Sequence, residues 1–270
     1  FDAAIRLLPY VSDGNFWLSC LHEATMHPRL VEFIDRIPRQ WRHKVMYTTN
    51  LARPMPDAYF SQLAEAGLHH VNISMESLDP EVYERMRKGA RWRIFSANWD
   101  KLVDALRAGS APPKLRYNIM SYRSNLEGIP DLVRLLFEQK LASQVEVRDT
   151  YDEPHIPADF RRNEYLDHAG WDWLRQQLSG YSPEDLLLIA PPPPSEAAAP
   201  PAAAPAPVRP SREEPPLRPT VYPISARMEY DGKLIIYNEW RDAAGQPVHD
   251  QLATTNIQRI RDVRGFLTSF

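Results

Sequence analysis

Residues 44–86 read KVMYTTNLARPMPDAYFSQLAEAGLHHVNISMESLDPEVYERM and contain one unit twice, an apolar strand followed by an amphipathic helix. The expected elements are a strand at 44–49, a helix at 57–66, a strand at 69–75 and a helix at 80–86. Gly67 would end the first helix and Asp79 would cap the second. Strands that alternate with helices at this spacing form a parallel sheet with right-handed crossovers. The stretch therefore predicts an α/β fold.

The same alternation continues on both sides of this stretch. Further strands are expected at 15–19, 115–121 and 144–149, and further helices at 28–37, 92–108, 126–139 and 159–178. Five strands at this spacing fit an open doubly wound sheet and a barrel equally well. In both architectures functional residues follow the carboxyl ends of the strands.

Proline divides the chain. Twelve of the 26 prolines fall between 191 and 220, which predicts an extended spacer there. A proline-rich ligand for a recognition module is the alternative. The predicted domains are therefore 1–190, a linker at 191–220 and a small unit at 221–270. In the small unit, Asp231-Gly232 predicts the turn of a hairpin over 224–240, and an amphipathic helix is expected at 255–270.

Composition excludes several classes of protein. The net charge of −3 and the isoelectric point of about 6.3 disfavour a nucleic-acid partner. No apolar run reaches the roughly 20 residues of a membrane span, and no signal peptide is visible, so a cytoplasmic protein is expected. The single cysteine, Cys20, excludes a disulfide framework and a cysteine-ligated metal site complete within the chain. Because Phe1 begins within an amphipathic stretch, we expect the start of the natural protein to be missing.

The segment SCLHEATMHP at 19–28 gathers polar side chains after the first strand. His22, Glu23 and His27 could ligate a metal ion, although the histidines are five residues apart rather than four. Alternatively, Glu23 and Thr25 cap a helix that starts at Pro28. We expect Cys20 to be a small apolar filler rather than a nucleophile.

Polar side chains also follow the later strands. They occur at 48–50, 74–77, 118–125 and 146–149. Each group alone can be explained as helix caps, turns or solvated charges. Together they describe a polar rim around one mouth of the sheet, and carboxylates, hydroxyls and amides in that arrangement suit a ligand with amine and ribose groups.

Four segments in this order resemble the middle and end of a radical S-adenosylmethionine (SAM) domain. They are LHEATMHP at 21–28, VMYTTNLARPMP at 45–56, AGLHHVNISMESLDPEVYERMRKG at 66–89 and LRYNIMSYRSNLEGIPDLV at 115–133. The resemblance implies a partial (β/α)6 TIM-like barrel that lacks its first strand. It also implies two cofactors, SAM and a [4Fe-4S] cluster. The CxxxCxxC loop that holds the cluster in this family would lie before Phe1, so no metal ligand is assigned within this chain and Cys20 is not a cluster ligand.

The resemblance also implies which residues bind SAM. Glu23 stands where the family has the glutamate of a Gly-Gly-Glu-Pro segment, which holds the SAM amino group, although both glycines and the proline are replaced here. Ser74 and Glu76 match residues that contact the ribose. Arg123 lies in a region that contacts the SAM carboxylate, and the backbone of 145–147 would meet the adenine. The complete implied set is Glu23, Thr25, Asn50, Ser74, Glu76, Asn118 and Arg123.

The implied function is that of a radical SAM enzyme. In complete form it would reductively cleave SAM to give a 5′-deoxyadenosyl radical, with a reductant such as flavodoxin or ferredoxin as partner. This chain alone is expected to be inactive. The segment 224–270 is similar to a SPASM or twitch extension without cluster cysteines, which weakly favours a peptide or protein substrate. The alternatives are a noncatalytic α/β binding or scaffold protein with a tethered docking module, and a metal-dependent hydrolase using His22, Glu23 and His27.

Overall fold

The structure is a computed structural model, and it describes residues 5–10, 15–18, 23–150, 156–191, 224–228, 233–241 and 247–256. The chain divides into two compact units, one of residues 13–193 and the other of residues 1–12 and 194–270. The predicted spacer lies outside the described residues apart from Pro191, and the predicted domain limits stay a prediction.

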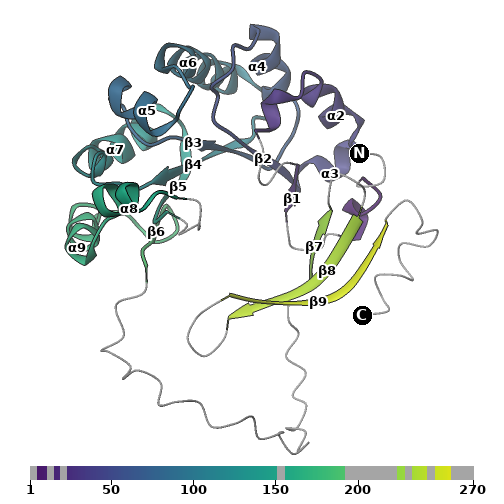
Figure 1. Cartoon of the computed structure of the whole chain (residues 1–270). Coiled ribbons are helices and arrows are strands. Elements are labelled where there is room, and N and C mark those ends of the chain that lie inside the picture. Colours follow the sequence, from purple (N-terminus) through teal and green to yellow (C-terminus); the bar gives the residue numbers. More distant parts are fainter. Residues whose placement is uncertain are drawn as a thin grey trace, which may run out of the picture. The chain divides into compact units, whose positions relative to one another are not determined.

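The larger unit is built on a six-stranded sheet in which every pair of neighbours is parallel. Its strands are β1 (Phe16–Trp17), β2 (Val45–Thr49), β3 (His70–Ser74), β4 (Lys114–Met120), β5 (Ala142–Arg148) and β6 (Leu186–Ile189). The strands follow one another in chain order, whereas a doubly wound sheet reverses its order at a switch point. The sheet curves with its helices on the convex side (Figure 1). This is the partial TIM-like barrel that the sequence predicted.

One of these strands was not predicted. Residues 186–189 form β6, which pairs with β5 from Leu186↔Val145 to Ile189↔Arg148. Four residues are short for a periodicity signal, and the segment is followed at once by prolines. Its strand conformation comes from the ladder that the exposed edge of β5 offers.

The helices cover one face of this sheet. They are α2 (Leu30–Arg36), α3 (Arg39–Arg42), α4 (Asp57–Ala64), α5 (Pro80–Met86), α6 (Trp92–Ala108), α7 (Ile129–Gln139), α8 (Ala158–Glu164) and α9 (His168–Gln177). Single 3₁₀ turns occur in this unit at η2 (Ala24–Met26) and η3 (Leu126–Gly128), and the smaller unit contains another, η1 (Leu8–Tyr10). The predicted limits of α5 and α6 are confirmed, and Asp79 caps α5 by accepting from the amides of Glu81 and Val82. Gly67 follows α4 at a φ of 70°.

One helix prediction needs correction, and one helix was missed. The helix expected at 28–37 begins at Leu30 instead. Its N-cap is Arg29, whose side chain makes no capping hydrogen bond. The short helix α3 was not predicted. The region expected as one helix or a pair at 159–178 is a pair, α8 and α9, separated by Tyr165, Leu166 and Asp167. Within the described residues, no helix combines the length and apolarity needed to cross a bilayer.

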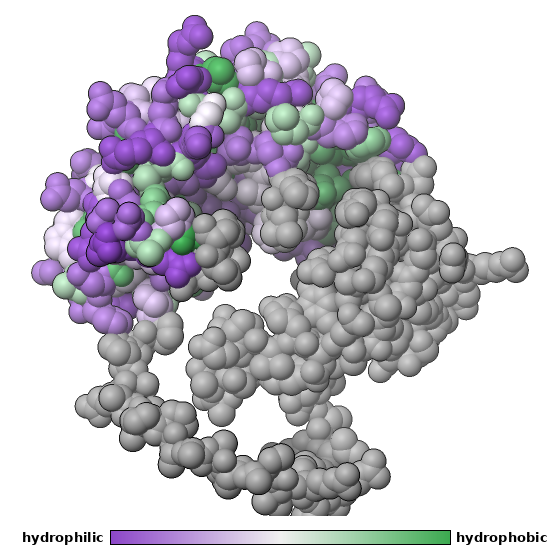
Figure 2. Space-filling model, in the orientation of Figure 1, coloured by the Kyte–Doolittle hydropathy of each residue, from purple (hydrophilic) through white to green (hydrophobic). Residues whose placement is uncertain are grey.

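Strand alternation gives the sheet one apolar and one polar face. Val71, Ile73, Tyr117, Ile119, Val145 and Val147 are fully buried, and they belong to the face that the helices cover. Two hydrogen bonds identify that face, from Trp99 Nε1 on α6 to the Tyr117 hydroxyl (2.9 Å) and between the hydroxyls of Tyr47 and Tyr59 on α4 (2.8 Å). The outer surface of the helices is mostly hydrophilic (Figure 2). Packing of amphipathic helices on the apolar face therefore supplies most of the hydrophobic stabilisation.

The intervening side chains project from the other, concave face, because residues two apart on a strand share a face. The polar ones are Thr48, His70, Asn72, Ser74, Lys114, Arg116, Asn118, Gln144, Glu146 and Arg148. The register places Asn72 opposite Arg116, and Ser74 opposite Asn118. A face lined this way is not an ordinary hydrophobic core, and it is the surface on which a polar ligand would lie.

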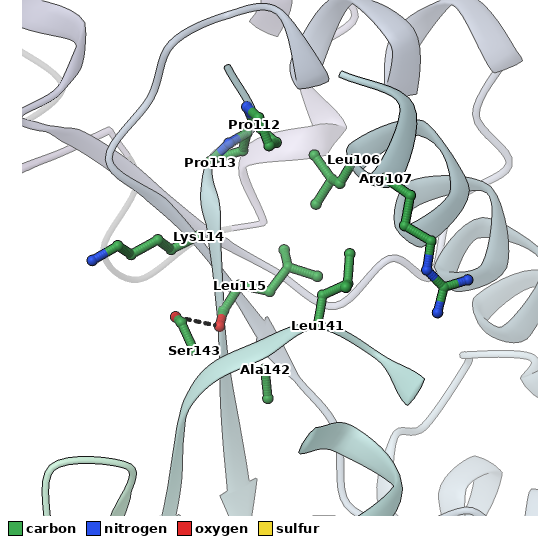
Figure 3. A pocket seen from close by; sticks show the side chains of 9 residues that line it. All are labelled: Leu106, Arg107, Pro112, Pro113, Lys114, Leu115, Leu141, Ala142 and Ser143. Atoms are coloured by element: carbon green, nitrogen blue, oxygen red, sulfur yellow. Dashed lines mark hydrogen bonds between the residues drawn. The ribbon is translucent and has the colours of Figure 1, made fainter. Parts of the chain in front are cut away.

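The described surface also has an open cavity of about 470 Å³, which lies at the amino-terminal ends of strands β4 and β5 (Figure 3). Lys114 and Ala142, the first residues of β4 and β5, line it together with Leu106 of α6 and Leu141. Functional residues of parallel α/β sheets gather at the carboxyl ends of the strands. The cavity is therefore separate from the candidate site below.

His70 makes the stability of this unit sensitive to acid. Its Nδ1 lies 2.5 Å from Nδ1 of His69, and burial, with His69, Arg116 and Lys114 nearby, lowers the pKa of His70 to about 4. The unfolded chain binds a proton near pH 6.5, so this contribution to stability is complete above pH 6.5 and is lost as the pH falls towards 4. We expect a loss of about 2–3 kcal/mol from this group, measured by urea unfolding at pH 7.0 and 4.5.

The matched variant is His70→Asn. It should lose less unfolding free energy than the wild type between the same two pH values, because Asn does not titrate. An equal loss in both proteins would contradict the assignment to His70.

The smaller unit contains a three-stranded antiparallel sheet of β7 (Ile224–Met228), β8 (Lys233–Arg241) and β9 (Pro247–Asn256). The predicted hairpin over 224–240 is confirmed by the pairing of β7 with β8, although its turn at Asp231-Gly232 lies outside the described residues. The predicted start of the final helix is wrong, because Thr255 and Asn256 belong to β9, which was not predicted. Residues 257–270 lie outside the described part.

Candidate functional site

The Glu23 carboxylate joins the segment after β1 to the end of β2. Its Oε1 accepts hydrogen bonds from Thr25 N (3.1 Å), Thr25 Oγ1 (2.6 Å) and Thr49 Oγ1 (2.7 Å), and its Oε2 accepts one from Asn50 N (2.6 Å). Three predicted site residues, Glu23, Thr25 and Asn50, are therefore brought together. Among the described residues Asn50 is the one donor to Oε2, and a carboxylate oxygen can accept a second hydrogen bond.

The backbone after β2 is shaped to support this arrangement. Leu51 has a φ of 50°, and its amide donates to Thr49 Oγ1 at 3.0 Å. The buried Asn98 of α6 donates from Nδ2 to the carbonyls of Leu51 (2.8 Å) and Arg53 (2.7 Å). A non-glycine residue with positive φ is strained, and a helix therefore holds the turn that aims Asn50 N at Glu23.

Ser74 and Asn118 lie opposite each other on β3 and β4, and Asn118 lies opposite Glu146 on β5. These two predicted residues thus form one layer across the concave face. Asn118 Oδ1 and Asn72 Oδ1 are buried and accept no hydrogen bond from the described residues. Buried amide oxygens normally find a donor, so we expect a polar ligand at this layer and at the neighbouring position of Asn72.

Glu76, predicted to contact the ribose, is already engaged by a residue that sequence reasoning missed. Arg87, which follows α5, donates from Nη2 to Glu76 Oε1 (2.7 Å) and from Nε to Oε2. The Glu76 side chain is only 6% exposed. Asn125 holds the segment in place by donating to the carbonyls of Glu76 and Met120. An arginine eleven residues downstream of a glutamate gives no periodic signal, so the pair could be found only in the structure.

Tyr83 is a second residue that the sequence analysis did not select. It is fully buried, and its hydroxyl has no hydrogen-bond partner among the described residues. Burial raises the pKa of Tyr83, and the charges of Arg87, Glu76 and Glu23 also act on it. Its hydroxyl is therefore a protonated donor in the electrostatic field of both predicted carboxylates.

Arg123 is not brought to the other predicted residues. Its Nε donates to the Tyr165 carbonyl (3.0 Å) and its Nη2 to Asp167 Oδ2 (3.1 Å), in the connection between α8 and α9. These bonds hold the guanidinium on that connection, with nearly half of the side chain exposed. The role predicted for Arg123 therefore depends on a rearrangement.

The metal-site alternative gains nothing from the described residues. His27 packs on Phe33 with ring centroids 4.5 Å apart, and its Nδ1 accepts from Arg29 N. Within the described ranges no three His, Cys, Asp or Glu side chains come together as a metal site, and Cys20 and His22 lie outside those ranges. The capping alternative is partly right, since Glu23 caps η2 rather than a helix that begins at Pro28.

Part of the larger unit matches a known protein family. The radical SAM superfamily matches residues 13–136, which run from before β1 into α7. This segment belongs to the radical SAM superfamily. The match covers Glu23, Asn50, Ser74 and Glu76.

Curated relatives of this radical SAM domain carry one name. A probable GTP 3′,8-cyclase of Thermoplasma volcanium is 28% identical over 158 residues, which are 54% of this chain and 46% of the relative. A GTP 3′,8-cyclase of Microcystis aeruginosa is 30% identical over 125 residues, which are 44% of this chain and 35% of the relative. The chain thus spans less than half the length of these relatives.

Part of the chain also aligns with solved structures. The Streptococcus suis protein SuiB aligns with a TM-score of 0.46 and 15% identity, over 63% of this chain and 37% of that one. A structure of TYW1 with a lysine-pyruvate adduct bound aligns with a TM-score of 0.44 and 15% identity, over 66% of this chain and 56% of that one.

Proposed function

We propose that this chain is the SAM-binding part of a radical SAM enzyme. The observation that carries the proposal is the Glu23 carboxylate, held by three neighbours at the ends of β1 and β2 within a radical SAM domain. A carboxylate fixed in this way is prepared to accept a hydrogen bond from an ammonium group.

The described residues fit SAM at several points. Glu23 Oε2 would accept from the ammonium, and Ser74 would contact the ribose. Glu76 would contribute a carboxylate oxygen while Arg87 holds it in one orientation. The chemistry supplied by bound SAM and a reduced cluster is one-electron cleavage to methionine and a 5′-deoxyadenosyl radical, which removes a hydrogen atom from substrate. The role of the protein is to orient SAM and exclude water.

The cluster itself does not fit the residues of this chain. Cys20 is the one cysteine in the sequence, whereas a cluster loop needs three. Ligands upstream of Phe1 therefore remain part of the proposal, and no step is assigned here to a residue that would hold iron. The reductant, flavodoxin or ferredoxin, is likewise proposed from the family.

The comparisons favour this function over the alternatives. The two curated relatives reported above are named as enzymes, and neither is named as a scaffold protein or a hydrolase. They are named for GTP, which gives no support to the peptide substrate suggested by the C-terminal hairpin. The SPASM-like character of 224–270 stays a prediction.

Anaerobic reconstitution of the full-length protein tests the proposal. With iron, sulfide and reductant, it should take up about four irons in one cluster and convert SAM to 5′-deoxyadenosine and methionine, measured by chromatography. The matched control omits the reductant and should give no 5′-deoxyadenosine. Absence of iron and sulfide uptake by folded protein would overturn the proposal.

A further inference from the structure

Two neighbouring strands carry buried polar atoms on the concave face that have no hydrogen-bond partner among the described residues. They are Asn72 Oδ1 on β3 and, on β4, Arg116 Nε and Asn118 Oδ1. The register places Asn72 opposite Arg116, and Asn118 is two residues further along β4. The three side chains therefore share one face and one small area of it. We call them the Asn72–Arg116–Asn118 group.

Hydrogen bonds to neighbouring strands fix which atoms of this group are left over. Asn72 Nδ2 donates to Thr48 Oγ1 at 3.2 Å, so the amide presents Oδ1 as its unused acceptor. Arg116 Nη2 donates to Glu146 Oε2, so the guanidinium is held against β5 while Nε donates to no described residue. Asn72 is only 3% exposed. A buried polar atom without a hydrogen bond is costly, so three of them in one place indicate a partner that the described residues do not supply.

The mixture of one donor and two acceptors decides the chemistry of that partner. A carboxylate or phosphate group only accepts hydrogen bonds, so it would leave both asparagine oxygens unsatisfied. An ammonium group only donates, so it would leave Arg116 Nε unsatisfied. A carbonyl oxygen with two N–H donors beside it satisfies all three atoms. His70 Nε2, one layer deeper on β3, also lacks a described partner, but it donates or accepts according to its tautomer and does not decide between these groups.

The spacing of the group fits one planar edge of a ligand. Neighbouring strands lie about 4.8 Å apart, and residues two apart on a strand lie about 6.6 Å apart. The Cα atoms of Asn72 and Asn118 are therefore about 8 Å apart on a diagonal, and their side chains can accept from one group that lies between them. Asparagine is also a residue that reads the polar edges of nucleobases, where it bonds to two adjacent atoms.

We propose that the Asn72–Arg116–Asn118 group binds an amide-type edge of the substrate. In this arrangement a carbonyl oxygen accepts from Arg116 Nε, and two N–H groups donate to Asn72 Oδ1 and Asn118 Oδ1. The guanine ring of a nucleoside and the carboxamide of a glutamine side chain both carry this edge. The proposal rests on the proposed function, because it places the substrate beside SAM on the concave face. Asn118 Nδ2 remains for the contact with SAM that the family resemblance implies.

Isothermal titration of the reconstituted full-length protein with guanosine and with N-acetylglutamine methylamide tests the proposal and distinguishes the two sources of the edge. Inosine keeps the carbonyl and one N–H but lacks the 2-amino group. If the nucleobase is the ligand, inosine should bind at least about tenfold more weakly than guanosine. If the carboxamide is the ligand, N-acetylmethionine methylamide should show a similar loss relative to the glutamine compound.

Three leucine variants assign the binding to the group. Asn72→Leu and Asn118→Leu each replace one acceptor by an apolar side chain of similar size, so each should lower the affinity by at least about tenfold. One of the two should also lose the preference for guanosine over inosine, because it lacks the acceptor of the 2-amino group. Asn163→Leu makes the same substitution at an exposed position of α8 and should leave binding unchanged.

Parallel titration with SAM separates this inference from the proposed function. Binding of either amide ligand without SAM binding would support the group and count against the proposed function. No binding of either amide ligand, whether or not SAM binds, would indicate that water alone satisfies these atoms and would overturn the inference. Loss of amide binding when SAM is present would overturn it as a substrate site. Equal affinity in the wild type, Asn72→Leu and Asn118→Leu proteins, with circular dichroism confirming that each is folded, would also overturn it.

Discussion

Arg87→Met should lower the free energy of unfolding by about 3–5 kcal/mol, the usual cost of leaving one partner of a buried ion pair alone. Glu76 is almost fully buried, and Arg87 supplies two hydrogen bonds to its carboxylate. Burial acts to lower the pKa of Arg87, but Glu76 outweighs it and the pKa is raised, as expected for a tightly coupled pair. Urea unfolding at pH 7 measures the loss.

A double variant identifies the cause. Without Arg87, the Glu76 carboxylate is left buried and unpaired, which is the costly state for a charge. The double variant Glu76→Gln, Arg87→Met should be more stable than Arg87→Met at pH 7.

A nearby arginine provides the control. Arg91 pairs with Glu84 at 3.1 Å, but the two side chains are 68% and 35% exposed. Arg91→Met should therefore cost less than about 1 kcal/mol. Similar losses in Arg87→Met and Arg91→Met would contradict a special role for the buried pair.

Glu23→Ala should weaken SAM binding by roughly 10- to 100-fold in the reconstituted protein. The reason is the loss of a charge-assisted hydrogen bond to the ammonium, which is worth about 1.5–3 kcal/mol. The same change removes the acceptor for Thr25, Thr49 and the Asn50 amide, so the segment after β1 also loses its connection to β2. Equilibrium dialysis with labelled SAM measures the effect.

Two variants distinguish binding from folding in this experiment. Thr49→Val removes the hydrogen bond to Glu23 and the acceptor of the Leu51 amide but leaves the carboxylate, so it should reduce stability and should lower SAM affinity much less than Glu23→Ala. Glu32→Ala removes an exposed glutamate from α2 and should change neither. Unchanged SAM affinity in folded Glu23→Ala would contradict the assignment of Glu23.

Much of the larger unit could be predicted because its signals are local. The helix α6 was predicted with its correct limits from amphipathic periodicity, and α5 was predicted from Asp79 followed by Pro80. Capping and burial periodicity depend on residues a few positions apart, which the chain displays directly. The missed strands β6 and β9 show the opposite case, because each is a strand through pairing with a neighbour that has an available edge.

The candidate site shows the same difference between local and long-range information. The sequence by itself determined the α/β alternation, the polar residues after each strand and the family order that pointed to Glu23. Only the tertiary structure decided that Thr49 and the Asn50 amide close on Glu23, that Glu76 is held by Arg87, and that Arg123 is bound elsewhere. The physical reason is range, since a side chain's type is local but its partner depends on which strands and helices the fold brings together. The same reason explains why Asn72 and Arg116 were ordinary polar residues in the sequence and lie opposite each other only in the folded sheet.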